Sequence, residues 1–449
     1  MTDRYAGVRS LWAPIGRLEH DPRALAALKL ANVGLAMSWG FAVTFVFVRL
    51  LPIAEFRAFL LLVAFANFTV SADFGFSGII YARLRRFRLE GASAATGDGG
   101  DFHPRDMAVL LAFMMAVVLT GALLIGGGIV TGHIPTERPG LFLAFYLLTA
   151  ANIFGILVKR AMAALDHNLL WELVDAVRRG LSLLVLLLAL VGLPILWSVF
   201  VQIGLAAAGL AIGLAVIHAS TGMRGADWWL RGVEMAVVWR TYMRDMGTTM
   251  ALTLSDVAAY TAPYFGIAMV TNDPRPLLVF DFIYKISRAL TAVIRALTEA
   301  ALPRLTAAWH EGRTARVREL IGRIRWLALG AAGALGLVLL ILGGRLSGVL
   351  FDGKAVLTLA ELVALAVLLC GLAMLCVSTF VHNGVGRFGA LLPTSVAFLI
   401  LSLASVAGAA WAARVTGEPF ALCFAILYAG VHVALGLRHG QLLRGMVRA

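Results

Sequence analysis

The 449-residue chain is 61% hydrophobic and only 14% charged, whereas a soluble domain has roughly 45–50% apolar and about 25% charged residues. This composition excludes an ordinary soluble protein and predicts an all-α integral membrane protein. The formal net charge of +13 does not indicate a nucleic-acid partner, because the arginines lie between apolar runs rather than on one basic face.

Apolar segments long enough to cross a bilayer follow one another along the whole chain, each near the roughly 20 residues that a helical span requires. Twelve are predicted, near residues 27–50, 56–82, 107–131, 140–163, 169–192, 194–218, 246–270, 276–300, 325–350, 357–381, 388–413 and 419–437.

The spans group into two predicted six-helix lobes around a central cavity, an N-lobe at residues 27–218 and a C-lobe at 246–437. Residues 1–26 are predicted to form a cytoplasmic N-terminal segment. Its first 23 residues are polar and basic and lack the short apolar core and cleavage site of a secretory signal, so we expect the first span to act as an uncleaved signal anchor. Residues 219–245 are predicted to form a cytoplasmic linker with an interfacial amphipathic helix, and residues 438–449 a cytoplasmic tail.

The basic residues are unevenly distributed, and this bias predicts the orientation of the spans. With the N-terminus inside, 26 of the 38 Lys and Arg residues fall in cytoplasmic segments and 5 within spans. The opposite side has only Arg49, Arg57, Arg138, Arg275, Arg345, Lys354 and Arg414. We therefore expect both termini in the cytoplasm.

The eighth span carries a stripe of charges at helical spacing: Asp281, Lys285, Arg288, Arg295 and Glu299. At about 100° per residue they fall within an arc of roughly 80°. Facing lipid, such a stripe would cost on the order of 10 kcal/mol, so we expect it to line a hydrated cavity. Asp281 with Lys285 and Arg295 with Glu299 form i,i+4 pairs, so Arg288 has no partner on its own helix. Its planar guanidinium, with N–H donors that can bind two oxygens at once, suits phosphate. The alternative is a set of salt bridges between helices.

The fifth span places Glu172, Asp175 and Arg179 on one face, which predicts either a second hydrated wall or a buried structural ion pair. Asp73 and Asp256 are single carboxylates within the second and seventh spans. Each is a candidate for a coupled proton, or for a hydrogen bond to a neighbouring helix.

The remaining polar and sulfur side chains indicate no enzyme and no cofactor. Cys370, Cys376 and Cys423 lie in apolar runs without metal-ligand spacing and are interpreted as packing residues. His382 and Asn383 are interpreted as solvated residues at a loop edge. No nucleophile elbow, P-loop or His-Glu-x-x-His motif occurs.

Two groups of short runs resemble a known family of transporters. They are Val48-Arg49-Leu50-Leu51-Pro52, Glu55-Phe56 and Ser71-Ala72-Asp73-Phe74-Gly75-Phe76 in the first, and Ala301-Leu302-Pro303-Arg304-Leu305 and His310-Glu311-Gly312-Arg313 in the second. They resemble bacterial polysaccharide-transport flippases of the O-antigen type, within the multidrug/oligosaccharidyl-lipid/polysaccharide (MOP) exporter superfamily.

The resemblance implies a protein of the bacterial cytoplasmic (inner) membrane that moves an undecaprenyl-pyrophosphate-linked oligosaccharide to the periplasmic leaflet by alternating access. Its implied partners are this substrate and membrane lipid, with the polysaccharide polymerase and glycosyltransferases as further candidates. On this hypothesis Lys285, Arg288, Arg295 and Arg179 bind the pyrophosphate.

Three alternatives stay open at this point. A multidrug or small-cation antiporter of the same superfamily would favour carboxylates over the cationic stripe of the eighth span. A membrane glycosyltransferase or ligase acting on lipid-linked sugars would need a sizeable outer loop, but the longest one here has only about a dozen residues. A structural membrane protein would gain little from an unpaired arginine at membrane depth.

Overall fold

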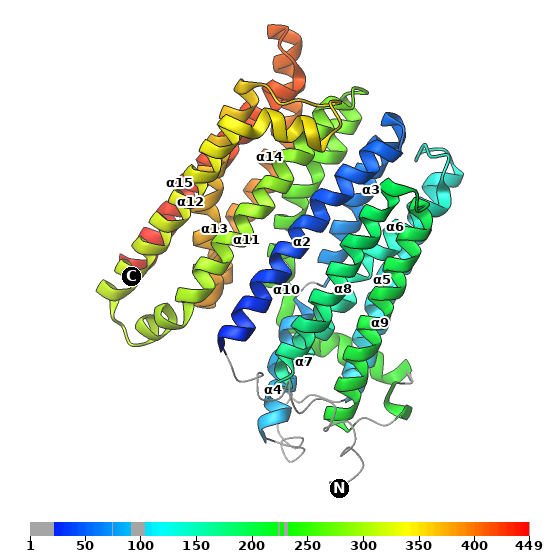
Figure 1. Ribbon diagram of the computed structural model, residues 1–449. Coiled ribbons are helices and arrows are strands. Elements are labelled where there is room, and N and C mark those ends of the chain that lie inside the picture. Colours follow the sequence, from blue (N-terminus) through cyan, green and yellow to red (C-terminus); the bar gives the residue numbers. More distant parts are fainter. Residues whose placement is uncertain (1–21, 74, 91–103, 223–224, 229–231, 449) are drawn as a thin grey trace. The chain divides into compact units, whose positions relative to one another are not determined.

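The computed structural model describes residues 22–73, 75–90, 104–222, 225–228 and 232–448. Within these ranges all the regular structure is helical, and no strand is present (Figure 1). The prediction of an all-α fold is therefore confirmed. Trp229 and the side chain of Trp239, which belong to the expected amphipathic face of the linker, lie outside the described part of the chain.

The α-helices follow one another through short connections. They are α2 (Pro22–Leu50), α3 (Ile53–Ser71), α4 (Phe76–Glu90), α5 (Pro104–Val130), α6 (Pro139–Ala150), α7 (Asn152–Ala164), α8 (Asn168–Leu188), α9 (Ile195–Thr221), α10 (Gly232–Val270), α11 (Arg275–His310), α12 (Thr314–Leu350), α13 (Leu359–Gly384), α14 (Leu392–Thr416) and α15 (Phe420–Arg448). Counting α3 with α4, and α6 with α7, the described residues form twelve helical segments.

Nine of these segments are long and apolar enough to cross a membrane by length and composition. The three described segments that fall short are α8, α10 and α11. They carry most of the charges singled out above as candidate site residues. The helices that do not meet the hydropathy criterion are therefore the ones on which the candidate site residues were predicted.

Side-chain hydrogen bonds mark the points where two of the helices begin. Between α3 and α4, the Asp73 carboxylate accepts hydrogen bonds from the hydroxyl of Ser77 (2.8 Å) and from its backbone N–H (3.2 Å), which caps the first turn of α4. Before α13, Thr358 and Glu361 form a capping box. The residues of both turns are thus held by side chains rather than by packing alone.

The chain divides into two units, each of which is described by itself. Unit 1 comprises residues 1–46 and 66–247, and unit 2 comprises residues 47–65 and 248–449. The predicted lobes were continuous in sequence. In the structure, the hairpin of residues 47–65 groups with the C-terminal helices, and the predicted linker segment groups with unit 1.

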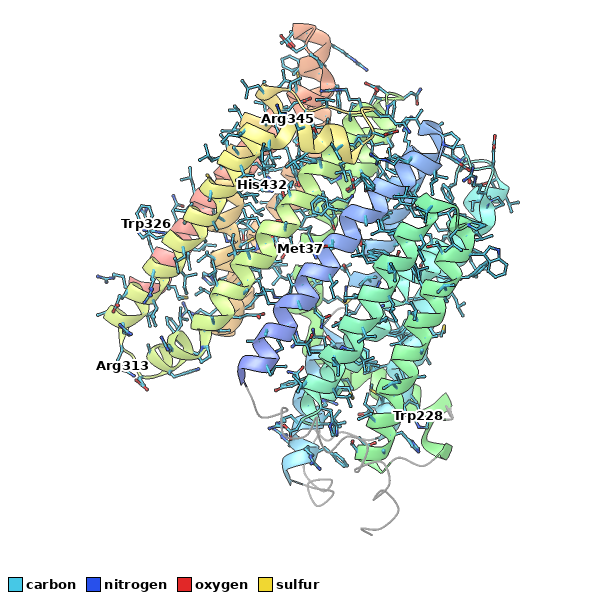
Figure 2. All side chains as sticks on the ribbon, in the orientation of Figure 1. Met37, Trp228, Arg313, Trp326, Arg345 and His432 are labelled. Atoms are coloured by element: carbon cyan, nitrogen blue, oxygen red, sulfur yellow. The ribbon has the colours of Figure 1, made fainter. Side chains whose placement is uncertain are left out.

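The helices of unit 2 enclose polar residues and expose apolar ones. Figure 2 shows His432 among the helices, whereas Trp326 projects away from α12. His432 is fully buried and Trp326 is 70% exposed. Large apolar side chains such as that of Trp326 are thus exposed on the surface, as a helix that faces lipid allows.

Candidate functional site

The buried end of the α11 stripe is an ion pair supported by a tyrosine. The Lys285 ammonium pairs with Oδ2 of Asp281, which is 1% exposed. The hydroxyl of Tyr264, on α10, donates to Oδ1 of the same carboxylate at 2.9 Å. Both carboxylate oxygens are therefore occupied, and Lys285 contributes little free positive charge in this arrangement.

Arg288, one turn further along α11, has a different environment. Its side chain is exposed, and no hydrogen bond or ion pair joins it to any residue that the structure describes. Its charge lies within electrostatic range of Tyr260 and Cys376, as does the carboxylate of Asp256. Within the described part of the chain, Arg288 is thus the member of the α11 stripe whose guanidinium has no hydrogen-bond or ion-pair partner.

The far end of the stripe, Arg295 with Glu299, lies in the second half of α11. Arg295 donates to Glu299 at 3.1 Å, and the two side chains are 58% and 63% exposed. The Arg295 guanidinium also lies 5.7 Å from the centroid of the Phe380 ring, within range of a cation–π contact. The structure thus contains both i,i+4 pairs and leaves Arg288 between them.

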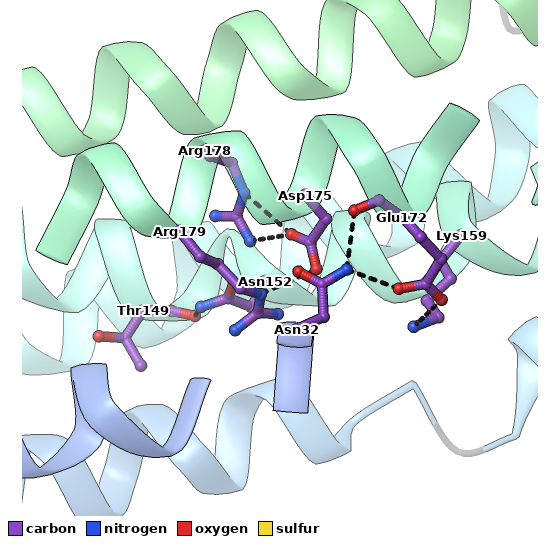
Figure 3. A network of polar contacts seen from close by, with 8 residues as sticks. All are labelled: Asn32, Thr149, Asn152, Lys159, Glu172, Asp175, Arg178 and Arg179. Atoms are coloured by element: carbon purple, nitrogen blue, oxygen red, sulfur yellow. Dashed lines mark hydrogen bonds and ion pairs between the residues drawn. The ribbon is translucent and has the colours of Figure 1, made fainter. Parts of the chain in front are cut away.

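Unit 1 contains a second polar network, shown in Figure 3. Glu172 is fully buried on α8, and its carboxylate lies 2.8 Å from the ammonium of Lys159 on α7. The Asn32 amide on α2 donates to the same carboxylate at 2.7 Å and to the Glu172 backbone carbonyl at 2.8 Å. A buried charge is thereby paired and hydrogen-bonded from two other helices.

One turn along α8, a single carboxylate holds two guanidinium groups (Figure 3). Asp175 accepts from Arg178 at 2.6 Å and from Arg179 at 2.8 Å. With Lys159 and Glu172 the network has three cations and two carboxylates, which leaves one excess positive charge. Arg179 is the more accessible of the two arginines, with 30% of its side chain exposed.

The two isolated carboxylates, Asp73 and Asp256, have different hydrogen-bond partners. Asp73 caps α4 as described above, so its oxygens are already engaged locally. Asp256, half-buried on α10, accepts a hydrogen bond from Ser395 on α14. Of the two, Asp256 is the one that lies within electrostatic range of Tyr260 on α10 and Cys376 on α13.

The interpretation of His382 as a solvated loop residue was wrong. Its side chain is 2% exposed, and its Nδ1 lies 2.8 Å from the carbonyl oxygen of Ser378. The reason is that α13 continues to Gly384, so His382 is inside the last turn of a packed helix. Of the cysteines interpreted as packing residues, Cys376 and Cys423 are buried and Cys370 is exposed.

Sequence reasoning missed the partners that other helices supply. Tyr264, Asn32 and Lys159 complete the two networks, yet none was singled out. The i,i+4 spacing reveals only contacts within one helix. The one available signal was that each of these residues is polar within, or at the end of, an apolar segment.

No family model and no curated protein matches the chain. Its fold, in contrast, is similar to that of solved MATE transporters of the MOP superfamily. An inward-facing multidrug resistance MATE family transporter has a TM-score of 0.68 at 12% identity, with 94% of this chain and 98% of that one covered. The Vibrio cholerae MATE transporter VcmN has a TM-score of 0.62 at 12% identity, with 95% and 97% covered.

A MOP superfamily transporter from Pyrococcus furiosus is also similar, with a TM-score of 0.55, 11% identity and 95% of each chain covered. The likeness thus extends over nearly the whole length of all three proteins. The chain is a multi-pass helical membrane protein with the fold of MOP transporters.

Proposed function

We propose that the protein is a transporter that moves an undecaprenyl-pyrophosphate-linked oligosaccharide from the cytoplasmic to the periplasmic leaflet of the bacterial inner membrane. The observation that carries this proposal is Arg288. It is an exposed guanidinium on the 36-residue helix α11, and no described residue pairs with it. A phosphate group is the natural partner for such a fork of donors.

The energetic argument concerns a charge kept at membrane depth. An arginine near the centre of a span costs about 2.5–3.5 kcal/mol on insertion scales, and the structure offsets this cost for Lys285 through Asp281. No described residue forms an ion pair with Arg288 that would offset the same cost. We infer that the compensation comes from an anionic substrate, with Lys285, Arg295 and Arg179 as further cationic contacts.

The charge balance of the two networks supports an anionic substrate. The α11 stripe has three cations and two carboxylates, and the network of unit 1 has the same balance. Each network therefore has one excess positive charge. An inside-negative potential favours outward movement of an anionic headgroup by about 2.3 kcal/mol per charge per 100 mV, which provides a driving force without a dedicated ion site.

A multidrug or small-cation antiporter is the second candidate, and the fold likeness to a multidrug resistance MATE family transporter favours it. Asp256 also favours it, because this half-buried carboxylate, held by Ser395, could bind a cation or a proton. The excess positive charge of the α11 stripe argues against an antiporter of cations. The Pyrococcus furiosus relative is a MOP transporter for which a reverse polarity of the binding pocket suggests a different function, and the same kind of argument supports an anionic substrate here.

The test uses the purified protein in liposomes with a fluorescent polyprenyl-pyrophosphate oligosaccharide, whose exposure to an external glycosidase reports flipping. Arg288→Ala should slow the flipping rate at least about tenfold, and Arg288→Lys should restore only part of it because the ammonium lacks the bidentate fork. Arg414→Ala is the matched control, since Arg414 is an exposed cation on α14.

Two results would contradict the proposal. One is an Arg288→Ala protein that flips the lipid as fast as the parent at equal protein levels. The other is a parent protein that exports organic cations in exchange for protons or sodium but leaves the lipid-linked oligosaccharide in place. The second result would establish the antiporter instead.

A further inference from the structure

Helix α12 is much longer than a membrane span requires. It has 37 residues, which at 1.5 Å per residue gives a length of about 55 Å. The hydrocarbon core of a bilayer is only about 30 Å thick. Part of α12 must therefore leave the hydrocarbon and pass through the layer of lipid headgroups.

The exposed side chains of α12 indicate which part lies in the hydrocarbon. Large apolar side chains are exposed from Trp326 through Ile341 to Val349. Between Trp326 and Val349 the helix rises about 35 Å, which matches the thickness of the hydrocarbon. Tryptophan favours the boundary between hydrocarbon and headgroups, and Trp326 projects away from the helices of unit 2 (Figure 2). We therefore place one headgroup layer at Trp326.

One turn beyond Trp326, toward the start of α12, the same face of the helix becomes basic. Arg323 is exposed, and about five full turns separate it from Ile341, so the two residues have the same angular position on the helix. Ile341 is among the most exposed apolar residues of α12, at 69%. Arg323 thus continues the face that contacts lipid, at the depth of the headgroups.

Arg323 has space around it and no partner within the protein. The neighbouring Gly322 has no side chain, and a Cβ atom built there would meet nothing within 4 Å. No hydrogen bond or ion pair joins Arg323 to any residue in the described ranges. Arg316, about two turns further from the membrane, differs because it donates to Glu319 at 2.6 Å. The Arg323 guanidinium is therefore available to an external anion.

Helix α15, which contacts α12, shows the same change of surface at the same end of unit 2. Leu437 is 68% exposed, and the exposed residues after it include Arg438 and Arg444. Figure 1 shows that the start of α12 and the end of α15 lie at one end of the unit. Two helices of unit 2 thus change from an apolar to a basic surface at this end.

We propose that Arg323, beside Trp326, binds the headgroup of an anionic phospholipid. The lipid phosphate accepts hydrogen bonds from the guanidinium, while the tryptophan ring and the exposed apolar face of α12 contact the rest of the lipid. The positive-inside bias predicts cations in this segment, but it does not predict an unpaired arginine on the face that meets lipid. The site lies on the surface of unit 2 and is distinct from the α11 stripe.

The test measures lipid preference beside Arg323 with a fluorophore. All three native cysteines are replaced by alanine, and Gly330→Cys carries the label, since Gly330 is exposed and a Cβ there meets nothing within 4 Å. It lies about two turns from Arg323 on the same face, at the depth of the acyl chains. The protein is placed in phosphatidylcholine vesicles, and quenching is compared between phosphatidylglycerol and phosphatidylcholine that carry a nitroxide on the acyl chain near the headgroup.

The parent protein should bind phosphatidylglycerol about fivefold more strongly than phosphatidylcholine at this position, the factor expected for one arginine near the surface. Arg323→Gln should bring the ratio close to one, and Arg323→Lys should retain most of the preference. Arg318→Gln is the matched control, because it removes an exposed cation that lies about 140° around the helix from Arg323. In about 1 M salt the preference of the parent should fall, since screening weakens it.

Three results would overturn the proposal. The first is equal quenching by the two lipids in the parent protein. The second is an equal loss of preference in Arg323→Gln and Arg318→Gln, which would indicate only a general effect of net charge. The third is little quenching by either lipid, which would mean that another protein surface covers this face of α12. The vesicles contain no lipid-linked oligosaccharide, so the result is independent of the proposed transport function.

Discussion

The contact between α13 and α15 leaves no room for a side chain at one glycine. A Cβ atom built on Gly371 would lie 2.4 Å from the carbonyl oxygen of His432, 2.5 Å from its carbonyl carbon and 2.7 Å from the nitrogen of Val433. From the other helix, a Cβ on Gly436 would lie 2.7 Å from the carbonyl oxygen of Gly371. The two backbones therefore meet directly, as small residues permit in membrane bundles.

Replacing Gly371 by alanine should force the two helices apart. Non-bonded carbon atoms normally lie about 3.5–4.0 Å apart, so the backbone of α15 must move by about 1 Å. The obstructing atoms are backbone, so no side chain can rotate to relieve the contact. Overpacking of this kind costs about 1–3 kcal/mol, and we expect Gly371→Ala to reach the upper end of that range and to lower the melting temperature by several degrees.

The assay is thermal unfolding of the detergent-purified protein, followed by fluorescence-detected size exclusion after heating. Gly430→Ala is the matched control, because a Cβ at that position on α15 meets nothing within 4 Å and alanine is the better helix former by about 1 kcal/mol. The control should therefore melt at or above the parent temperature. If Gly371→Ala melted with the control, the close approach of α13 and α15 would be wrong.

Three further predictions concern polar contacts. Glu361 is 1% exposed and binds Arg275 through two bonds of 2.9 Å, so Glu361→Gln should lower the free energy of unfolding by about 2 kcal/mol, measured as a loss of melting temperature. The Trp39 indole donates to Gln202 at 2.9 Å; Trp39→Phe should cost about 1 kcal/mol in the same assay, and an unchanged melting temperature would contradict it. Arg295 is 58% exposed, so Arg295→Gln should change stability by less than about 0.5 kcal/mol, and a larger loss would mean that its pair with Glu299 is structural.

The existence of the helices was predictable because a bilayer imposes a length and an apolar composition on every span. The contacts of Asp281 with Lys285 and of Arg295 with Glu299 were predictable for a related reason, since residues four apart always lie on one helix face. These features depend on one helix at a time. They need no information about which helices are neighbours.

Contacts between helices were beyond the reach of the same reasoning. Nothing in the periodicity of α8 indicates that Asn32 and Lys159, from α2 and α7, meet the carboxylate of Glu172. Tyr264 binds Asp281 from α10, and the sequence offers no signal for this pairing. The division of α2 and α3 between two units likewise depends on tertiary packing, which single-chain hydropathy does not contain.

The seven cations predicted to lie outside are exceptions to the charge bias that predicts the orientation of the chain, and the structure supplies a physical reason for four of them. Arg49, Arg57 and Lys354 cap helix ends, and Arg275 binds the buried carboxylate of Glu361. Translocating a basic residue is unfavourable during insertion, so a sequence retains one on that side where the folded protein uses it. The positive-inside bias and the binding of these four cations to carbonyl and carboxylate oxygens therefore have a common origin. Cations are sparse in the segments predicted to face outward because they are costly to translocate, and four of the seven there bind carbonyl or carboxylate oxygens.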